Sequence, residues 1–144
     1  MALLPVSTVS GLANQGAKLS ASAVFKELPE YAAGMAADGD PSTRWATPAG
    51  TKEAWLEIDL GAEKSFRSME IDEATAIDKG MRARVLGFQI EIKDGNQWKP
   101  IYHGKGIGEH KICPFPSAIR ARFFRIRITD ATDGPTLQEV RLLE

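Results

Sequence analysis

Alternation of apolar and polar side chains with a period of two is the feature that most limits the possible folds. Leu56, Ile58 and Leu60 fall on one face of an extended chain, and more polar residues fall on the other. The same alternation recurs in three further segments: 68–72, 86–92 and 123–128. No segment carries a sustained helical stripe. The pattern therefore predicts an all-β fold of about eight short antiparallel strands, a β-sandwich for which a jelly roll is one closure.

Turn-forming residues separate these segments. Asp94-Gly95-Asn96 stands between two alternating runs and predicts a β-hairpin over residues 88–102. Leu60-Gly61-Ala62 predicts a turn between two separate strands. The alanine-rich segment 32–37 predicts at most one helical turn, because Gly34 weakens it.

Length and composition indicate one globular domain. The chain has 144 residues, of which 43% are hydrophobic and 26% charged, and no apolar run is long enough for a membrane span. The apolar segment that follows Met1, Ala2-Leu3-Leu4-Pro5, is too short for a secretory signal. We therefore expect residues 1–144 to form one domain excised from a larger protein, whose signal lies outside this chain.

The net charge of −1 conceals two halves of opposite sign. Residues 27–78 contain 12 acidic and 4 basic side chains, whereas residues 79–127 contain 11 basic and 3 acidic ones. The basic residues alternate with apolar ones, as in Phe124-Arg125-Ile126-Arg127. We therefore expect acidic and basic strands to pair within one sheet, and we expect no nucleic-acid partner.

No catalytic constellation is evident in the sequence. His103 and His110 lack a second ligand at zinc spacing, and there is no nucleophile elbow or phosphate-binding loop. The single cysteine, Cys113, lies between Ile112 and Pro114, which is typical of a buried and unreactive thiol. The chain is therefore predicted not to be an enzyme.

The segment Asp38-Gly39-Asp40-Pro41-Ser42-Thr43 concentrates oxygen ligands in a turn. Calcium binds six to eight such oxygens, many of them backbone carbonyls. The spacing is not that of an EF-hand, and an Asx-turn without metal explains the same residues. Both interpretations stay open on these residues alone.

Longer stretches around this loop resemble a known family. Asp38 through Thr47, then Ala54-Trp55-Leu56-Glu57-Ile58-Asp59-Leu60-Gly61, are similar to the discoidin or factor V/VIII type C domains. The similarity continues through Trp98, the 124–127 segment and Leu137-Gln138-Glu139-Val140, so it covers about 17–142. Within this group the chain resembles the family 32 carbohydrate-binding modules. It is most similar to the C-terminal module of bacterial family 29 α-L-fucosidases, on Glu73 with Arg82 and on residues 107–111.

The resemblance implies a jelly-roll sandwich with a structural calcium ion. The resemblance implies these ligands for the ion: the side chains of Asp38 and Thr43, the Asp40 position and Glu139. The backbone carbonyls of Ala36 and Gln138 are further candidates. Such an ion would tie the last strand to the acidic loop. The resemblance also implies that the three tryptophans pack the sandwich: Trp45, Trp55 and Trp98.

The sugar-binding candidates lie on variable loops. Tyr31 could stack on a sugar ring, or be an ordinary surface tyrosine. Glu73 and Arg82 could present a carboxylate and a guanidinium to neighbouring hydroxyls, or form a plain salt bridge that holds a loop. Arg84 and His110 are secondary candidates, for which a solvated role is the alternative.

We therefore expect a non-catalytic module that binds terminal galactose- or fucose-like sugars. Its partners would be a glycan or terminal monosaccharide and the catalytic domain of a secreted glycoside hydrolase, of α-L-fucosidase type. The parent protein would be secreted, periplasmic or at the cell surface. Two alternatives remain: an architectural domain that packs on a catalytic domain and binds no sugar, and a discoidin-type module for adhesion or phospholipid binding.

Overall fold

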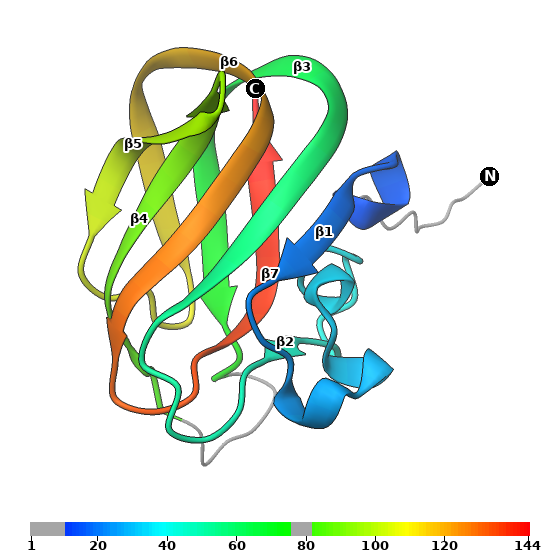
Figure 1. Cartoon of the computed structure of the whole chain (residues 1–144), viewed down its shortest axis with the longest axis vertical. Coiled ribbons are helices and arrows are strands. Elements are labelled where there is room, and N and C mark those ends of the chain that lie inside the picture. The colour runs from blue at the N-terminus through cyan, green and yellow to red at the C-terminus, as the bar shows by residue number, and fades with distance from the viewer. Residues whose placement is uncertain (1–10, 76–81) are drawn as a thin grey trace, which may run out of the picture.

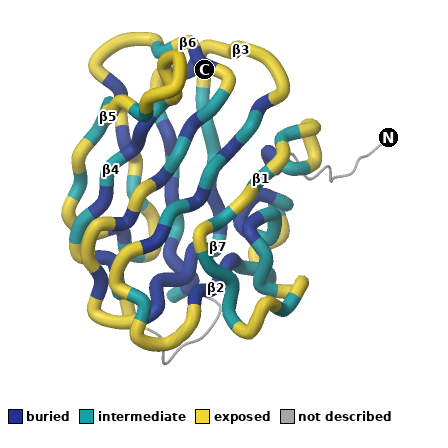
Figure 2. The backbone as a smooth tube through the Cα atoms, in the orientation of Figure 1, coloured by how far each residue is buried: buried dark blue, intermediate teal, exposed yellow. Residues whose placement is uncertain are grey.

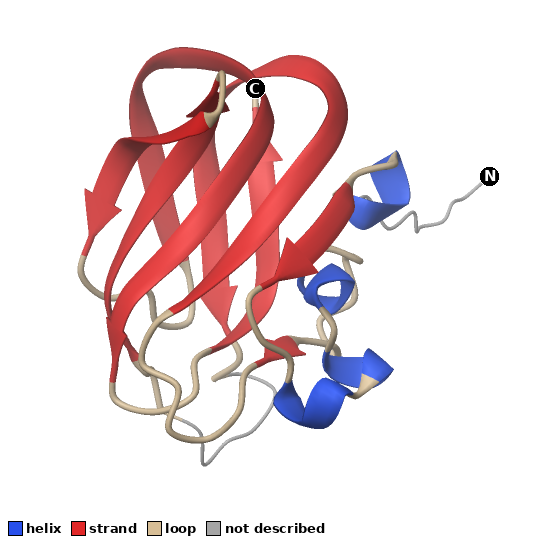
Figure 3. Ribbon diagram, viewed as in Figure 1, coloured by secondary structure: helices blue, strands red, loops and turns tan. Residues whose placement is uncertain are grey.

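The computed structural model describes residues 11–75 and 82–144, and more than half of these lie in β-strands (Figure 3). The strands are β1 (Lys18–Ala21), β2 (Trp45–Ala46), β3 (Ala54–Glu73), β4 (Val85–Asp94), β5 (Gln97–Gly104), β6 (Lys111–Ala131) and β7 (Thr136–Leu143). Four short 3₁₀ helices precede or follow β1: η1 (Ala13–Gln15), η2 (Phe25–Glu27), η3 (Pro29–Tyr31) and η4 (Ala33–Ala36). Within the described residues, no helix is long and apolar enough to cross a membrane.

Two long strands, β3 and β6, bend and run through both layers of a sandwich (Figure 1). The first part of β3 pairs with β1 and with the second part of β6. This part of β6 also pairs with β4, and β4 pairs with β5 at the edge of the layer. The second part of β3 pairs with the first part of β6 and with β7, which pairs with β2. All pairings are antiparallel, so the predicted all-β jelly-roll sandwich is confirmed.

The structure has seven described strands rather than eight short ones because a predicted turn is a bulge. Leu60-Gly61-Ala62 lies inside β3, where the pairing with β6 shifts register between Asp59 and Lys64. Gly61 adopts a φ of 83°, which a glycine reaches without steric cost. The strand therefore bends at this point without ending. The hairpin predicted at Asp94-Gly95-Asn96 is confirmed, since β4 pairs directly with β5.

The core lies between the two layers, where buried residues face inward from each (Figure 2). Phe124 contacts the rings of Phe66 and Phe115, at centroid distances of 5.9 and 6.2 Å. Trp45 is fully buried, and its indole N–H donates to the Ala23 carbonyl. The prediction that all three tryptophans pack the sandwich is wrong for Trp55 and Trp98.

These two side chains are only half-buried, because they lie on the outer face of the layer that contains β1, β4 and β5. The guanidinium carbon of Arg125 lies 4.3 Å from the centre of the Trp98 ring. A cation over the face of a tryptophan is attracted by its π-electrons, and its stem covers apolar surface. Arg125 thus shields Trp98 from water on the surface of the sheet.

Opposite charges pair across the strands, as the alternating basic residues predict. Arg125 Nε donates to Glu91 Oε1 at 2.6 Å, and Glu91 is only 3% exposed. Arg122 forms a two-point contact with Asp59, at 2.8 and 3.1 Å. The Arg125–Glu91 pair is the buried one, and removal of one partner there would leave the other charge unpaired. The Arg122–Asp59 pair is more exposed and joins the basic half of the chain to the acidic half.

Cys113 is expected to resist alkylation in the folded protein. Its side chain is fully buried, and burial raises the pKa of the thiol to about 11. Only the thiolate is a strong nucleophile, so both access and ionisation oppose reaction. Iodoacetamide at pH 8 should leave the native protein unmodified by mass spectrometry over hours, while the urea-unfolded protein reacts within minutes. Rapid labelling of the native protein would contradict the burial of Cys113.

Candidate functional site

Four connections between strands gather at one end of the sandwich, which we call the loop end (Figure 1). It is formed by the β2–β3, β5–β6 and β6–β7 connections and by the described ends of the β3–β4 connection, residues 74–75 and 82–84. The antiparallel topology brings the ends of β3, β5 and the second half of β6 to the same edge as the starts of β4 and β7. Most of the sugar candidates predicted from the sequence come from this end: Glu73, Arg82, Arg84 and His110.

Glu73 does not present its carboxylate to solvent, which corrects the prediction that it contacts a sugar. It ends β3 and is only 1% exposed. One carboxylate oxygen accepts the Gly108 N–H at 2.9 Å, and the other accepts the N–H groups of Arg84 at 2.7 Å and Val85 at 3.3 Å. These bonds commit both oxygens to the backbone. Glu73 therefore holds two connections together.

Arg82 and Arg84 differ in their surroundings. Arg82 is exposed, and no ion pair joins it to Glu73 within the part of the chain that the structure describes. The guanidinium of Arg84 donates to the Gly134 carbonyl at 2.7 Å, so it is anchored in the β6–β7 connection. The expected Glu73–Arg82 pair is thus absent. Arg82 remains an accessible guanidinium at the loop end.

His110 belongs to a charged cluster on the outer face of β3 and β7. Its Nδ1 lies 2.6 Å from Asp72 Oδ1, and its side chain is 46% exposed. Arg141 donates to Asp72 at 2.9 Å and to Glu70 at 3.2 Å. The imidazole is therefore oriented by a carboxylate and still open to solvent. This arrangement offers both donors and acceptors to a polar ligand.

Tyr31 lies in a different environment, between β1 and β2. Its ring meets Phe25 edge to face at 5.6 Å, and the Arg44 guanidinium carbon lies 5.6 Å from its centre. The neighbouring loop surrounds a hollow of about 480 Å³ with mostly apolar walls. Tyr31 is half-buried by these contacts, so they occupy part of the ring surface that a sugar would need.

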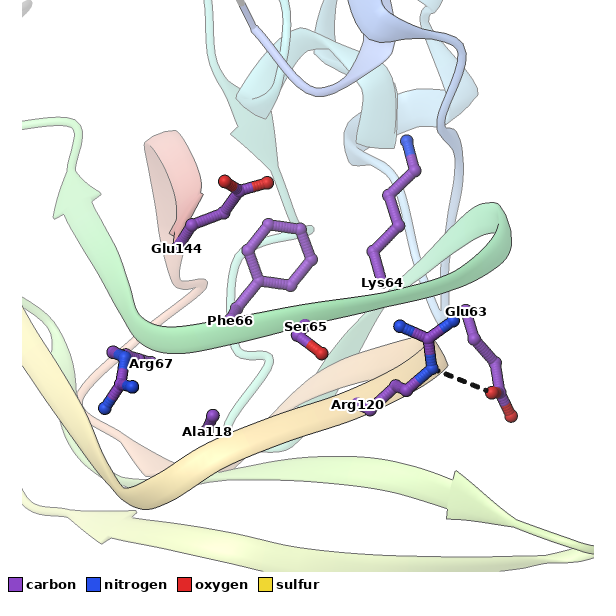
Figure 4. Close-up of a pocket in the computed structure, with 8 residues that line it drawn as sticks. All are labelled: Glu63, Lys64, Ser65, Phe66, Arg67, Ala118, Arg120 and Glu144. Carbon is purple, nitrogen blue, oxygen red and sulfur yellow. Dashed lines mark hydrogen bonds and ion pairs between the residues drawn. The ribbon is translucent and has the colours of Figure 1, made fainter.

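Another hollow, of about 470 Å³, lies at the opposite end, where β3 and β6 bend. Arg67 and Arg120 lie on one side of β3, whereas Lys64 and Phe66 point to the other (Figure 4). Arg120 pairs with Glu63 at 3.3 Å, and both side chains are mostly exposed. An exposed pair of this kind is weak. The polar groups do not converge on one point, so we place the candidate sugar site at the loop end.

The acidic loop places several oxygens around the Thr43 hydroxyl. Thr43 Oγ1 lies 2.6 and 2.8 Å from the two Asp38 carboxylate oxygens. It also lies 3.1 Å from the carbonyl oxygens of Met35 and Asp40. A hydroxyl has one proton to donate, so it cannot satisfy four acceptors at once. Oxygens crowded in this way match the donor set that calcium requires.

Glu139 adds an orphaned buried oxygen to this cluster. Its Oε2 accepts the Gly39 N–H at 3.0 Å, whereas Oε1 is buried with no hydrogen-bond partner. Burial, together with the nearby Asp38 charge, raises the pKa of this carboxyl to about 8. An unpaired buried carboxylate is costly unless a cation or a proton compensates it. The residues around Asp38 and Glu139 therefore fit a bound calcium ion.

Three details of this loop were not foreseen from the sequence. The Asp40 carboxylate turns outward to accept the Ser42 N–H and hydroxyl, at 2.9 and 2.7 Å, so only its carbonyl faces Thr43. Gln138 donates its amide to the Pro41 carbonyl at 3.1 Å, which ties the loop to β7. Met35 supplies a carbonyl near Thr43 in place of the expected Ala36. Among the described residues, no group of three or more His, Cys, Asp or Glu side chains could hold a metal, so carbonyls and a hydroxyl must contribute.

Gly11 packs directly against this loop, so Gly11→Ala is expected to be destabilising. A Cβ there would lie 2.3 Å from the Ala37 carbonyl oxygen and 2.5 Å from the Gly39 nitrogen. Relief of such a clash with backbone costs roughly 2 kcal/mol in cores. Urea unfolding should show this loss for Gly11→Ala. Gly34→Ala is the matched control, because no atom lies within 4 Å of its Cβ, and its stability should not fall. Equal stability of both variants would contradict the packing.

Several residues of the two sites carry no sequence signal. Met35 contributes a carbonyl, which any residue has, and Gly11 contributes only close approach. Asp133 accepts the N–H groups of Gly50 and Gly134, and the Asp133-Gly134-Pro135 sequence marks only a turn. Arg141 and Asp72 could have been found from strand alternation, which places them outward on neighbouring strands.

Residues 18–140 match the family model described as F5/8 type C domain. A fucosidase of glycoside hydrolase family 29 from Ruminococcus gnavus, E1_10125, solved with fucose, is 31% identical. The match covers 93% of this chain and 26% of that one, with a TM-score of 0.78. The family 32 carbohydrate-binding module of C. perfringens NanJ, solved with galactose, is 19% identical. It covers 92% of this chain and 97% of that one, with a TM-score of 0.76, and shares the fold.

A rice (Oryza sativa subsp. japonica) protein, named provisionally as alpha-L-fucosidase 1, is 28% identical over 93 residues. That match covers 65% of this chain and 17% of the rice protein. The chain thus spans about a quarter or less of the fucosidases that it resembles. The matched family is a type of binding domain rather than a catalytic one, and its model spans most of the chain. The β-sandwich described above is therefore that of an F5/8 type C (discoidin) domain, and the chain belongs to this family.

Proposed function

We propose that this chain is a non-catalytic module that binds terminal galactose- or fucose-like sugars at its loop end. The observation that carries the proposal is the 31% identity, over 93% of the chain, to part of a fucosidase solved with fucose. The galactose-bound family 32 module shares the same sandwich. At the loop end, exposed Arg82 and the oriented imidazole of His110 offer the polar groups that sugar hydroxyls need.

A glycan array followed by calorimetric titration tests this proposal. We expect millimolar to high-micromolar affinity for a galactose- or fucose-terminated glycan, since a shallow site buries few ligand atoms. Arg82→Ala and His110→Ala should each weaken binding at least fivefold without lowering the melting temperature. Arg67→Ala is the matched control, because Arg67 is exposed at the opposite end. Loss of binding in Arg67→Ala alone, or no binding to any glycan, would overturn the proposal.

We further propose that the Asp38 loop and Glu139 hold a structural calcium ion. The orphaned Glu139 Oε1 and the oxygens around Thr43 support this assignment. Asp38, Thr43, Glu139 and the carbonyls of Met35 and Asp40 would bind the ion. Its chemistry would be charge neutralisation: it would join β7 to the loop before β2 and take no part in a reaction.

The parent protein is proposed to be a glycoside hydrolase of α-L-fucosidase type, secreted, periplasmic or at the cell surface. Its catalytic domain would use this module to stay near its glycan. The named fucosidases among the similar proteins support this. Because each is several times longer than this chain, a catalytic domain attached to the module fits their length.

An architectural role is the second candidate, and one observation favours it. Ile112 is 56% exposed on the outer face of β6, next to exposed Pro114, and Leu86 is 50% exposed on β4. A continuous apolar patch marks a contact between domains, whereas single exposed side chains are common, so Ile112 with Pro114 carries this argument. If this role were the whole function, Ile112→Asp would weaken packing on the catalytic domain and no glycan would bind. Glycan binding by the free module decides between the two candidates.

A further inference from the structure

A chain of hydrogen bonds crosses the loop end and joins its four connections. It begins at Glu73, whose carboxylate accepts the N–H groups of Gly108 and Arg84. The backbone returns one of these links, because the Glu73 N–H donates to the Gly108 carbonyl at 2.8 Å. The β5–β6 connection is thus fastened to the end of β3 and to the start of β4.

Arg84 connects this network to the β6–β7 connection. Its guanidinium donates to the Gly134 carbonyl at 2.7 Å, and its own carbonyl accepts the Thr132 N–H at 2.9 Å. Because the Arg84 N–H is fixed by Glu73, the arginine backbone and side chain are oriented from the same buried carboxylate. Two segments about 50 residues apart in sequence are therefore held in one arrangement.

Asp133 extends the hydrogen-bond network to the β2–β3 connection. Its Oδ1 accepts the Gly134 N–H at 2.8 Å and the Gly50 N–H at 2.5 Å. These bonds lower the pKa of the Asp133 carboxyl, so it stays ionised at neutral pH. Contact between the two connections is close, since a Cβ on Gly134 would lie 2.5 Å from the Pro48 carbonyl oxygen.

We infer that Glu73, Arg84 and Asp133 are positioning residues that hold the described parts of the four connections at the proposed sugar site as one unit. The inference rests on the proposed function for its ligand, but the coupling between loops is a property of the free protein. Arg82 and His110 would contact the sugar, while Glu73 would act through the backbone that carries them. Preorganised loops lose less conformational entropy when a ligand binds, so affinity would depend on a carboxylate that the sugar does not touch.

Amide hydrogen exchange, followed residue by residue by NMR, tests the coupling. Glu73→Gln keeps the shape of the side chain but replaces one acceptor by an amide group that cannot accept the facing N–H groups. We expect at least tenfold faster exchange at Gly108 and Arg84 and also at Gly50 and Gly134, which Glu73 does not touch. Asp133→Asn should speed exchange at Gly50 and Gly134 and, through Arg84, at Gly108.

Two references separate this effect from general destabilisation. Core amides such as that of Ile126 report any loss of global stability, so in both variants exchange at the loop-end amides should speed up more than exchange at Ile126. Asp59→Asn is the matched control: Asp59 accepts the Gly61 N–H at 2.9 Å at the opposite end, so only that region should change. Faster exchange in Glu73→Gln that is confined to residues 84, 85 and 108 would overturn the inference.

Sugar affinity supplies the second readout, at a temperature well below the melting transition. Glu73→Gln and Asp133→Asn should each raise the Kd for the glycan found on the array about fivefold to tenfold. The double variant should show less than the product of the two effects, because the residues act in one chain. Multiplicative effects would contradict the coupling. Coupled exchange without any glycan binding would instead refute the proposed function and leave the positioning unit standing.

Discussion

Glu73→Ala is expected to destabilise the domain by about 4 kcal/mol, the largest effect of any single substitution considered. The carboxylate is 1% exposed and accepts three backbone N–H groups, two on one oxygen and one on the other. Its removal strands these donors in a buried site, at roughly 1–3 kcal/mol each before relaxation, and leaves a cavity. The melting temperature should fall by roughly 10 °C or more.

Urea unfolding at constant m-value measures this loss. Glu57→Ala is the matched control, because Glu57 lies on the same strand but on the half-exposed outer face, opposite Arg125. We expect it to cost less than about 1 kcal/mol, as for other substitutions on a protein surface. Glu73→Gln should fall between the two. If Glu73→Ala cost no more than Glu57→Ala, the buried hydrogen bonds described above would not be those of the native protein.

Removal of calcium is expected to have the second-largest effect. A ligand that binds only the folded state stabilises it by about 2.7 kcal/mol when its concentration is 100 times its Kd. For a domain of this size, EGTA should therefore lower the melting temperature by several degrees and at most by roughly 10 °C. Added calcium should restore it. The physical reason is that two carboxylates, on buried Glu139 and half-buried Asp38, lie close together, and that Glu139 Oε1 is buried with no hydrogen-bond partner.

Two variants locate the ion. Asp38→Asn should abolish the response to EGTA, because Asp38 contributes both carboxylate oxygens to the cluster. Asp40→Asn should keep the response, because the Asp40 carboxylate points outward to Ser42. Differential scanning fluorimetry at matched ionic strength separates the two. An unchanged melting temperature in EGTA would contradict the calcium site, and loss of the response in Asp40→Asn would contradict the ligand set.

The fold follows from the sequence to the extent that strand alternation and turns determine it. Leu56, Ile58 and Leu60, with Phe88 and Ile90 on β4 and their counterparts on β6, are buried as the period of two predicts. The alternation fails at Leu86, which is 50% exposed where the pairing of β4 with β6 shifts register. The alternation could not show that Gly61 continues a strand as a bulge. That outcome depends on pairing with β6, about 60 residues away, and not on local turn propensity.

The candidate sites are less predictable because many of the groups that form them are backbone carbonyls and N–H groups. The sequence indicated Asp38, Thr43 and Glu139 by composition and resemblance, and these three do meet. Backbone carbonyls carry no residue type, so the position of Met35 could not be foreseen. Glu73 illustrates the opposite error: a carboxylate next to a loop suggests a ligand contact, but the three N–H groups that face it are invisible in the sequence.

Titration of the ¹⁵N-labelled domain with L-fucose and D-galactose tests the central claim most directly. We predict saturable shift changes in the amides of the loop end, at residues 82–84, 106–110 and 132–135. Amides at the opposite end, around residues 63–67 and 118–120, should not shift. The changes should disappear in Arg82→Ala. No saturable shifts with either sugar or with a glycan that ends in it, or shifts confined to the opposite end, would contradict the account.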